Sequence, residues 1–249
     1  MKYFFAILVA ITTFLISNGQ SKLKTKAPAD TLLNKILKDL PHGMQDEFLK
    51  EYKKMSPEQK KTMLQFSEFV SSVPKSSKKQ LIQNIDTNYN NVLALKNFFR
   101  KIVPANYSIY IEFKPPEKML KLDESIDFWV FKKISDSTQD ETIFQEWNVE
   151  LRSAKLDSLL ALTPLNRSNL QELRNYLDKA NCISISNRDI CEIGYARSGM
   201  GKYSYLIFDN ALSDEEKKQY SNDCEYIFYK NNIVLEYGGG AIGAQCFPD

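Results

Sequence analysis

The sequence predicts an α+β protein in which an N-terminal four-helix region precedes a mainly antiparallel β-sheet domain with two to three helices. Apolar residues recur with a helical period from 28 to 102, and the period changes to two at Tyr107. Short gaps separate most of the later strands, which favours hairpins and hence antiparallel pairing. We therefore expect a helical region over 28–104 and a sheet domain over 105–249.

The first 19 residues have the three zones of a secretory signal peptide. One lysine follows the initiating methionine, the stretch from Tyr3 to Ile16 is mostly apolar, and Ser17 and Gly19 form a small-x-small cleavage site. The apolar stretch is short for a membrane-spanning helix, which needs about 20 residues, although an uncleaved anchor is the alternative. No cysteine lies near the cleavage point and no later segment is apolar enough to span a bilayer. These features predict a soluble periplasmic or extracellular protein, cleaved near Gly19, without a lipid anchor.

Four amphipathic helices are expected between 28 and 104. Their apolar stripes lie within 32–40, 44–55, 63–70 and 81–102. The segment Ser56-Pro57-Glu58-Gln59 combines an N-cap serine, a proline at the first helical position and a glutamine three residues after the serine, which is typical of a helix start.

Alternating apolar and polar residues predict the strands of the second region, beginning with 107–114. Further strands are expected over 127–133, 143–151, 182–186, 190–197, 202–209, 225–230 and 233–237. Helices are expected over 156–162, 169–180 and 213–222. Asn231-Asn232 suits a two-residue hairpin turn, because asparagine tolerates positive φ.

The net charge of +2 argues against nucleic acid as the main partner. Residues 22–102 hold 16 Lys and Arg against 8 Asp and Glu, whereas residues 103–249 hold 16 against 23. This split favours solvated, lysine-rich helix faces, and the alternative is a basic surface that meets an anionic envelope polymer.

All four cysteines lie in the last third of the chain, and an even number in an exported protein indicates two disulfides. We expect the pairs Cys182–Cys191 and Cys224–Cys246. Spacings of 9, 33 and 22 residues without a C-x-x-C pair fit structural zinc poorly, so no metal site is expected.

Known catalytic motifs are missing. The chain has one histidine, His42, and neither His-Glu-x-x-His nor Gly-x-Ser-x-Gly is present, which argues against histidine-dependent hydrolysis. The segment 196–203 departs from a phosphate-binding loop at its first glycine and at its hydroxyl position, where Tyr203 stands. No catalytic residue and no cofactor are predicted, which favours a non-enzymatic role.

Paired carboxylates remain a catalytic alternative, because glycoside cleavage needs two acids and no histidine. The acidic residues on predicted strands that could serve are Glu112, Asp127, Glu146, Glu150 and Glu236.

The candidate binding residues are Arg197, Lys202, Tyr203 and Tyr205, around the turn that precedes the strand 202–209. A tyrosine stripe beside two cations would make a contact surface for a protein or a sugar if one face of this strand is open. The alternative is that the tyrosines pack in the core.

Together these features predict an exported binding protein, a protein-binding or inhibitor- or immunity-like module of the bacterial envelope. Its expected partner is another protein or an envelope polymer. The alternatives are an envelope polysaccharide hydrolase with paired carboxylates and a structural or adhesion component.

Overall fold

The structure of the 249-residue chain is a computed structural model. It describes residues 31, 33, 34, 37, 45–72, 75–116, 123–134, 140–198, 201–222, 224–238 and 246–247. The chain divides into two compact units, Met1–Val73 and Pro74–Asp249. The predicted signal peptide, His42 and most of the first predicted helix lie outside the described residues.

The first unit contains α3 (Gln45–Lys54) and α4 (Pro57–Ser72). The predicted capping box is present between them, because Gln59 N donates to Ser56 Oγ at 3.2 Å and Ser56 N donates to Gln59 Oε1 at 2.9 Å. The apolar residues of this unit form a small cluster of their own: Phe48, Met63 and Leu64, with Leu33, Leu37, Tyr52 and Met55 packed against them.

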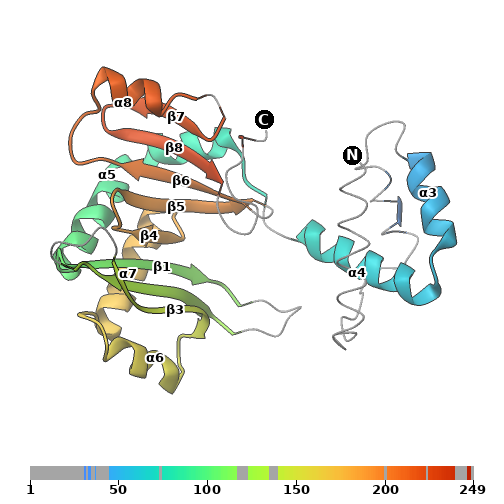
Figure 1. Ribbon diagram of the computed structural model, residues 1–249, viewed down its shortest axis with the longest axis horizontal. Helices are drawn as coiled ribbons and strands as arrows, with labels where there is room; N and C mark the ends of the chain where they lie inside the picture. The colour runs from blue at the N-terminus through green and yellow to red at the C-terminus, as the bar shows by residue number, and fades with distance from the viewer. Residues whose placement is uncertain are drawn as a thin grey trace. The chain divides into compact units, whose positions relative to one another are not determined.

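The second unit is built on one antiparallel sheet of eight strands (Figure 1). The strands are β1 (Tyr107–Lys114), β2 (Ser125–Lys132), β3 (Glu141–Glu150), β4 (Ser184–Ser186), β5 (Cys191–Ser198), β6 (Gly201–Ile207), β7 (Tyr226–Lys230) and β8 (Ile233–Gly238). The helices are α5 (Lys78–Ile102), α6 (Ala154–Leu160), α7 (Arg167–Ala180) and α8 (Asp214–Gln219). The strand order is β3-β2-β1-β4-β5-β6-β8-β7.

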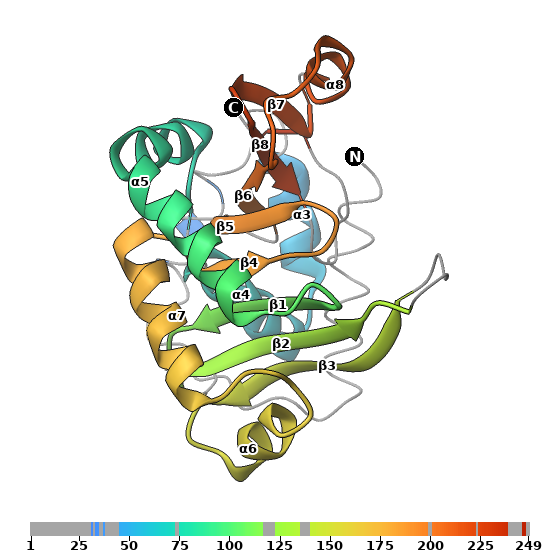
Figure 2. The same ribbon diagram turned by 90° about the vertical axis from the view of Figure 1, so that its left-hand side faces the viewer.

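Two helices cover one face of this sheet. Figure 2 shows α5 and α7 side by side on the left of the strands, as a layer against the sheet. Their apolar stripes meet the inward residues of the sheet in a continuous core, in which Leu95 and Leu173 join Ile111 and Ile193. Because such stripes repeat every three to four residues, burying them against a sheet stabilises both layers.

The helix α5 corrects the predicted architecture. It is the fourth helix of the predicted region 28–104, but it belongs to the compact unit of the sheet and supplies part of its core. A separate four-helix region is therefore not supported. Its apolar stripe was recognised in the sequence, but a periodicity does not indicate whether a helix packs on other helices or on a sheet.

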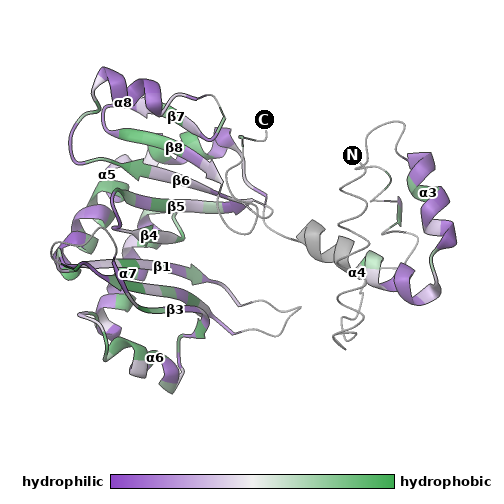
Figure 3. Cartoon of the chain, viewed as in Figure 1, coloured by the Kyte–Doolittle hydropathy of each residue, from purple (hydrophilic) through white to green (hydrophobic). Residues whose placement is uncertain are grey.

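The short helix α8 covers the opposite face at the β7 end. It is mostly hydrophilic (Figure 3), and the connections around it contribute apolar side chains to a second cluster. This cluster contains Leu206, Leu212 and Val234, with Phe208, Tyr220 and Phe228 packed against it. Ser213 and Glu216 form a capping box at the start of α8, where the sequence predicts a helix.

The predicted α+β class and antiparallel sheet are confirmed, and each predicted strand corresponds to an observed one. The Asn231-Asn232 turn also forms, with Asn231 at φ 49° and Lys230 paired with Ile233. Within the described part of the chain, no helix is both long and apolar enough to cross a membrane.

Candidate functional site

The sheet face opposite α5 and α7, called here the polar face, carries an unusual number of buried polar side chains. In β1, Ile109 and Ile111 face the helices, so Tyr110 and Glu112 point the other way. Neighbouring strands follow the same alternation. The buried polar or charged residues on this face are Ser108, Glu112, Ser125, Asp127, Ser184, Ser186 and Ser204.

Glu112 and Arg197 form the central ion pair of the polar face. Arg197 Nε donates to Glu112 Oε1 at 2.5 Å and Arg197 Nη2 donates to Glu112 Oε2 at 2.8 Å. The hydroxyl of Tyr110 also donates to Glu112 Oε2. Burial alone would raise the pKa of Glu112, but the hydrogen bonds from Arg197 and the charge of Lys202 hold it below its usual range. Glu112 is therefore ionised although only 1% of its side chain is exposed.

Lys202 connects this pair to a second carboxylate. Its Nζ lies 2.8 Å from Glu192 Oε1 and 5.0 Å from the ring centroid of Tyr110. Ser204 Oγ donates to the same Glu192 oxygen at 3.0 Å. Burial opposes the charge of Glu192, but Lys202 outweighs it and lowers the pKa of that carboxyl. We call Tyr110, Glu112, Glu192, Arg197 and Lys202 the ion-pair network.

A third carboxylate behaves differently. Glu236 lies in β8 opposite Ser204 of β6, on the side of β6 away from Glu192. Burial and the negative charge of Glu192 raise the pKa of Glu236 to about 7, and Lys202 offsets only part of this. Near neutral pH the ion-pair network therefore holds two ionised carboxylates, Glu112 and Glu192, whereas Glu236 is partly protonated.

Three aromatic rings run from the ion-pair network to the edge of the sheet. Tyr110 of β1 stacks on Trp129 of β2 with ring centroids 4.4 Å apart, and Trp129 meets Trp147 of β3 edge to face at 5.7 Å. Trp147 lies on the edge strand and is 54% exposed. We call Tyr110, Trp129 and Trp147 the aromatic row.

Several polar atoms beside the aromatic row have no protein partner. Within the described residues, Ser108 Oγ, Ser186 Oγ and Trp129 Nε1 are buried and make no hydrogen bond. A buried polar atom without a partner costs about 1–3 kcal/mol.

The structure separates the four predicted binding residues. Arg197 and Lys202 are paired across β5 and β6 and both belong to the ion-pair network. Tyr203 and Tyr205 point to the opposite face and are fully buried, so they are core residues and not a contact surface. Tyr205 OH donates to Leu81 O at 2.8 Å and accepts from Asn84 Nδ2 at 3.1 Å, which ties β6 to α5.

The predicted carboxylates divide in the same way. Glu112, Asp127 and Glu236 lie on the polar face, where Asp127 is buried and paired with Lys114 at 2.7 Å. Glu146 pairs with Lys155 on the surface, and Glu150 is exposed at the end of β3. Sequence reasoning missed Glu192, Tyr110 and Trp129. These residues alternate along their strands with Ile193, Ile111 and Phe128, which face the helices. This alternation could have placed all three on the polar face.

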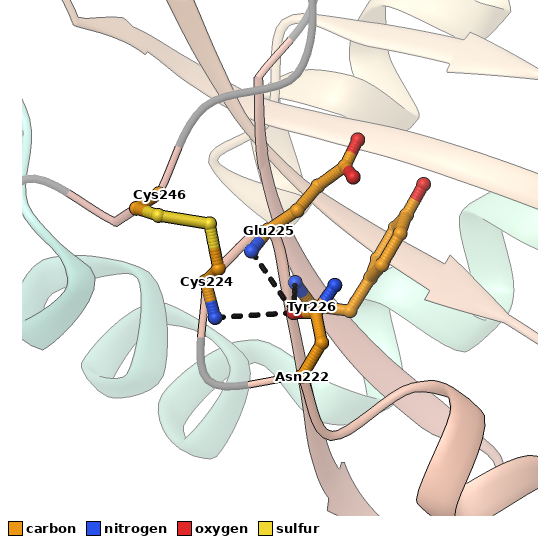
Figure 4. The surroundings of a disulfide bond; sticks show 5 residues. All are labelled: Asn222, Cys224, Glu225, Tyr226 and Cys246. Atoms are coloured by element: carbon orange, nitrogen blue, oxygen red, sulfur yellow. Dashed lines mark hydrogen bonds between the residues drawn. A yellow bond between two sulfur atoms is a disulfide. The ribbon is translucent and has the colours of Figure 1, made fainter.

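One of the two predicted disulfides is present. Cys224 and Cys246 are bonded, and Asn222 Oδ1 accepts hydrogen bonds from the backbone N of Cys224, Glu225 and Tyr226 beside the bond (Figure 4). These bonds fix the loop that presents Cys224.

The predicted Cys182–Cys191 bond does not form, and both residues are free thiols. The β4–β5 register pairs Ser186 with Glu192, which places Cys191 opposite Asn187, next to the turn. Cys182 lies before β4 at the other end of this hairpin, about 16 Å away along the strand. That separation exceeds the roughly 7 Å that a disulfide can bridge between Cα atoms. The sequence predicted a turn at Ser186-Asn187, but the observed turn lies between Ser186 and Glu192. The longer turn shifts the pairing of β4 with β5, so that Cys182 and Cys191 are not opposite each other.

Comparison with protein-family models, curated proteins and solved structures finds no match to this chain.

Proposed function

We propose that this chain is an exported binding protein, a protein-binding or inhibitor-like module, that recognises another protein through the β3 side of its polar face. The observation that carries the proposal is the aromatic row, which leads from a buried ion-pair network to the half-exposed Trp147 on an edge strand.

Residue chemistry supports a protein partner. Tryptophan, tyrosine and arginine dominate the binding energy of protein interfaces, and the aromatic row and Arg197 place all three types on one face. Exposed tryptophan is otherwise unfavourable, because its ring keeps apolar surface in water.

The rigidity of the site supports binding as well. Trp129 holds the ring of Trp147, and Tyr110 holds Trp129 in turn. A side chain that is already fixed loses little conformational entropy when a partner docks on it. The disulfide Cys224–Cys246 supports export, because disulfides persist in oxidising compartments.

Substitution of Trp147 tests the proposal. The mature protein, Trp147→Ala and Leu162→Ala are each immobilised and exposed to lysate and envelope fractions of the source organism. Leu162 is a matched control, because it is 57% exposed but follows α6 and is not part of the aromatic row. We expect a stoichiometric protein partner that wild type and Leu162→Ala retain and Trp147→Ala loses. Equal capture by all three proteins, or no stoichiometric partner, would contradict the proposal.

The pair Glu192 and Glu236 favours a second candidate, an envelope polysaccharide hydrolase. Two carboxyl groups whose pKa values are pushed apart by their surroundings are the usual acid and base of such enzymes. In this function Glu236 would donate a proton and Glu192 would act as the ionised partner. Release of soluble fragments from purified envelope polysaccharide by wild type, but not by Glu236→Gln or Glu192→Gln, would establish it.

A further inference from the structure

A second site lies at the other end of the β5–β6 hairpin from Arg197 and Lys202. A cavity of about 580 Å³ opens there between the last turns of α5, the residue after β2, the β4–β5 turn and the end of β6. Cavities of roughly 300–1,000 Å³ are typical of small-molecule sites.

The inner wall of this cavity is apolar. It includes Phe99 of α5, Val103 directly after this helix, and Ile207 of β6, all of which belong to the core and are almost completely buried. The half-buried Ile190 and Cys191 complete this wall. Such a surface favours a hydrocarbon or aromatic body over water.

The polar wall is dominated by cations. Among the residues that the structure describes, Lys96, Arg100, Lys133 and Arg188 line the cavity, together with two acids, Asp189 and Asp209. Arg188 packs its guanidinium 5.0 Å from the ring centroid of Phe131, which limits the positions its side chain can take.

One of the two acids is already bound within the protein. Lys96 Nζ lies 2.9 Å from Asp209 Oδ1, and Arg100 pairs with the other oxygen of the same carboxylate. Lys96 also donates to the carbonyls of Ile207 and Phe208 at 3.0 and 2.9 Å, so its three donors are used. These contacts fix Asp209 as an anion, and hydrogen bonds from Lys96 and Arg100 hold its pKa below the usual range.

Two other cations of the cavity wall, Lys133 and Arg188, are not paired with a carboxylate of the described residues. The cavity therefore combines an apolar inner wall with an excess of positive charge. This arrangement matches a molecule that has an apolar body and a negative head group, since a guanidinium can bind a carboxylate or phosphate through two parallel hydrogen bonds.

We propose that this cavity binds a small organic anion with an apolar body and a carboxylate or phosphate head group, held by Arg188 and Lys133. The site is separate from the polar face, so its occupancy does not depend on the proposed protein partner.

Calorimetric titration with matched amphiphiles tests this proposal. Decanoate and decyl phosphate carry the two head groups on the same chain, and decyltrimethylammonium is the cationic control, each below its critical micelle concentration. We expect either anion to bind and the cation to bind at least tenfold more weakly. Tighter binding of one anion identifies the head group. Absence of binding by both anions, or equal binding of the cation, would overturn the proposal.

Two variants locate the binding site. We expect Arg188→Gln and Lys133→Gln each to weaken the binding of the anion about tenfold, the effect of losing roughly one charge-assisted hydrogen bond. Arg152→Gln is the matched control, because Arg152 is exposed between β3 and α6 and does not line the cavity. The same loss in all three variants would indicate nonspecific charge attraction and would overturn the proposal.

Cys191 provides a readout that does not depend on these substitutions. Cys191 is one of the residues that line the cavity, whereas the other free cysteine, Cys182, is buried and does not line it. We expect the anion to slow alkylation of Cys191 in wild-type protein while the rate at Cys182 stays unchanged, as measured by peptide mass spectrometry. Binding without protection of Cys191 would place the ligand outside this cavity.

Discussion

The guanidinium of Arg197 on β5 binds the carboxylate of Glu112 on β1 across β4, which lies between these two strands in the sheet. The ion pair spans the shortest strand of the sheet, because β4 consists of only Ser184, Ile185 and Ser186. Ser184 is paired with Glu112 on one side and with Gly194 on the other. Its small side chain leaves room for the side chains of Glu112 and Arg197 to meet above β4.

Removal of the arginine tests the strength of this link. We expect Arg197→Ala to lower the free energy of unfolding by about 2 kcal/mol, because it leaves the buried Glu112 carboxylate without its main partner. The value is below the usual loss for a buried pair, since Arg197 is 37% exposed and Tyr110 and Lys202 remain in place. Urea unfolding followed by circular dichroism measures the change.

A surface ion pair serves as the control for this variant. Lys155 and Glu146 lie 2.6 Å apart with side chains that are 55% and 34% exposed, so Lys155→Ala should change stability by less than about 1 kcal/mol. Addition of Glu112→Gln to Arg197→Ala should recover part of the loss, because it removes the unpaired charge. Equal effects of Arg197→Ala and Lys155→Ala would show that the central pair contributes no more than a surface contact.

The close approach at Gly194 gives a second prediction. A Cβ at this position would lie 2.1 Å from Ser184 Oγ and 3.0 Å from Lys202 Cδ. We therefore expect Gly194→Ala to destabilise the protein by about 1–3 kcal/mol through overpacking. In the double variant with Ser184→Ala the clashing hydroxyl is gone, so the loss should be smaller than the sum of the single losses. Additive losses in urea unfolding would indicate another cause.

The raised pKa of Glu236 predicts a particular pH dependence. Its pKa increases from 4.5, the value of an unperturbed glutamate, to about 7 in the folded chain, so folding favours the protonated form. The stability associated with this group is present below pH 4.5 and is lost as the pH rises through 7, by about 3 kcal/mol in all.

Comparison with Glu236→Gln isolates this contribution. The variant lacks the titrating group, so its stability relative to wild type should increase between about pH 5 and about pH 8. The buried Glu112 titrates with the opposite sign in both proteins and cancels in the difference. Glu192 is coupled to Glu236 by charge repulsion, so the difference reports the two groups together. A constant difference across this pH range would mean that Glu236 is ionised throughout.

The cysteine arrangement predicts the number of reactive thiols. Unfolded protein without reductant should take up two alkyl groups, at Cys182 and Cys191, and reduction should expose the other two cysteines. Reduction of Cys224–Cys246 should also lower the free energy of unfolding by about 3 kcal/mol, because the bond closes a loop of 22 residues. Peptide mass spectrometry gives the sites, and alkylation of none or four cysteines before reduction would contradict this pairing.

The fold was accessible from the sequence where local patterns decide it. Alternation identified the strands, and Ser56, Ser213 and the Asn231-Asn232 turn marked element ends by their own hydrogen-bonding chemistry. The position of α5 was not accessible, because its stripe fits a helix bundle or a sheet equally well. The Cys182–Cys191 error has the same origin, since a register depends on the turn length, which the sequence left open.

The candidate site was accessible only in part. Arg197 and Lys202 were identified because they flank a turn between two strands. Tyr203 and Tyr205 were ambiguous, because the strand is covered on both faces and its alternation does not indicate which face is the core. The pairing of Glu112 with Arg197 joins positions 85 residues apart, so no local pattern contains it.

The short strand β4 also divides the sheet into two sequence-local halves. One half is the meander of β1, β2 and β3, and the other contains β4 to β8. The seam between them depends on contacts such as Ile109 N to Asn187 Oδ1, 78 residues apart along the chain. Closing so long a loop has a large entropic cost, so each half should gain structure before the seam joins. Low φ-values at Ile185, with higher values inside each half, would identify the seam as the last part of the sheet to fold.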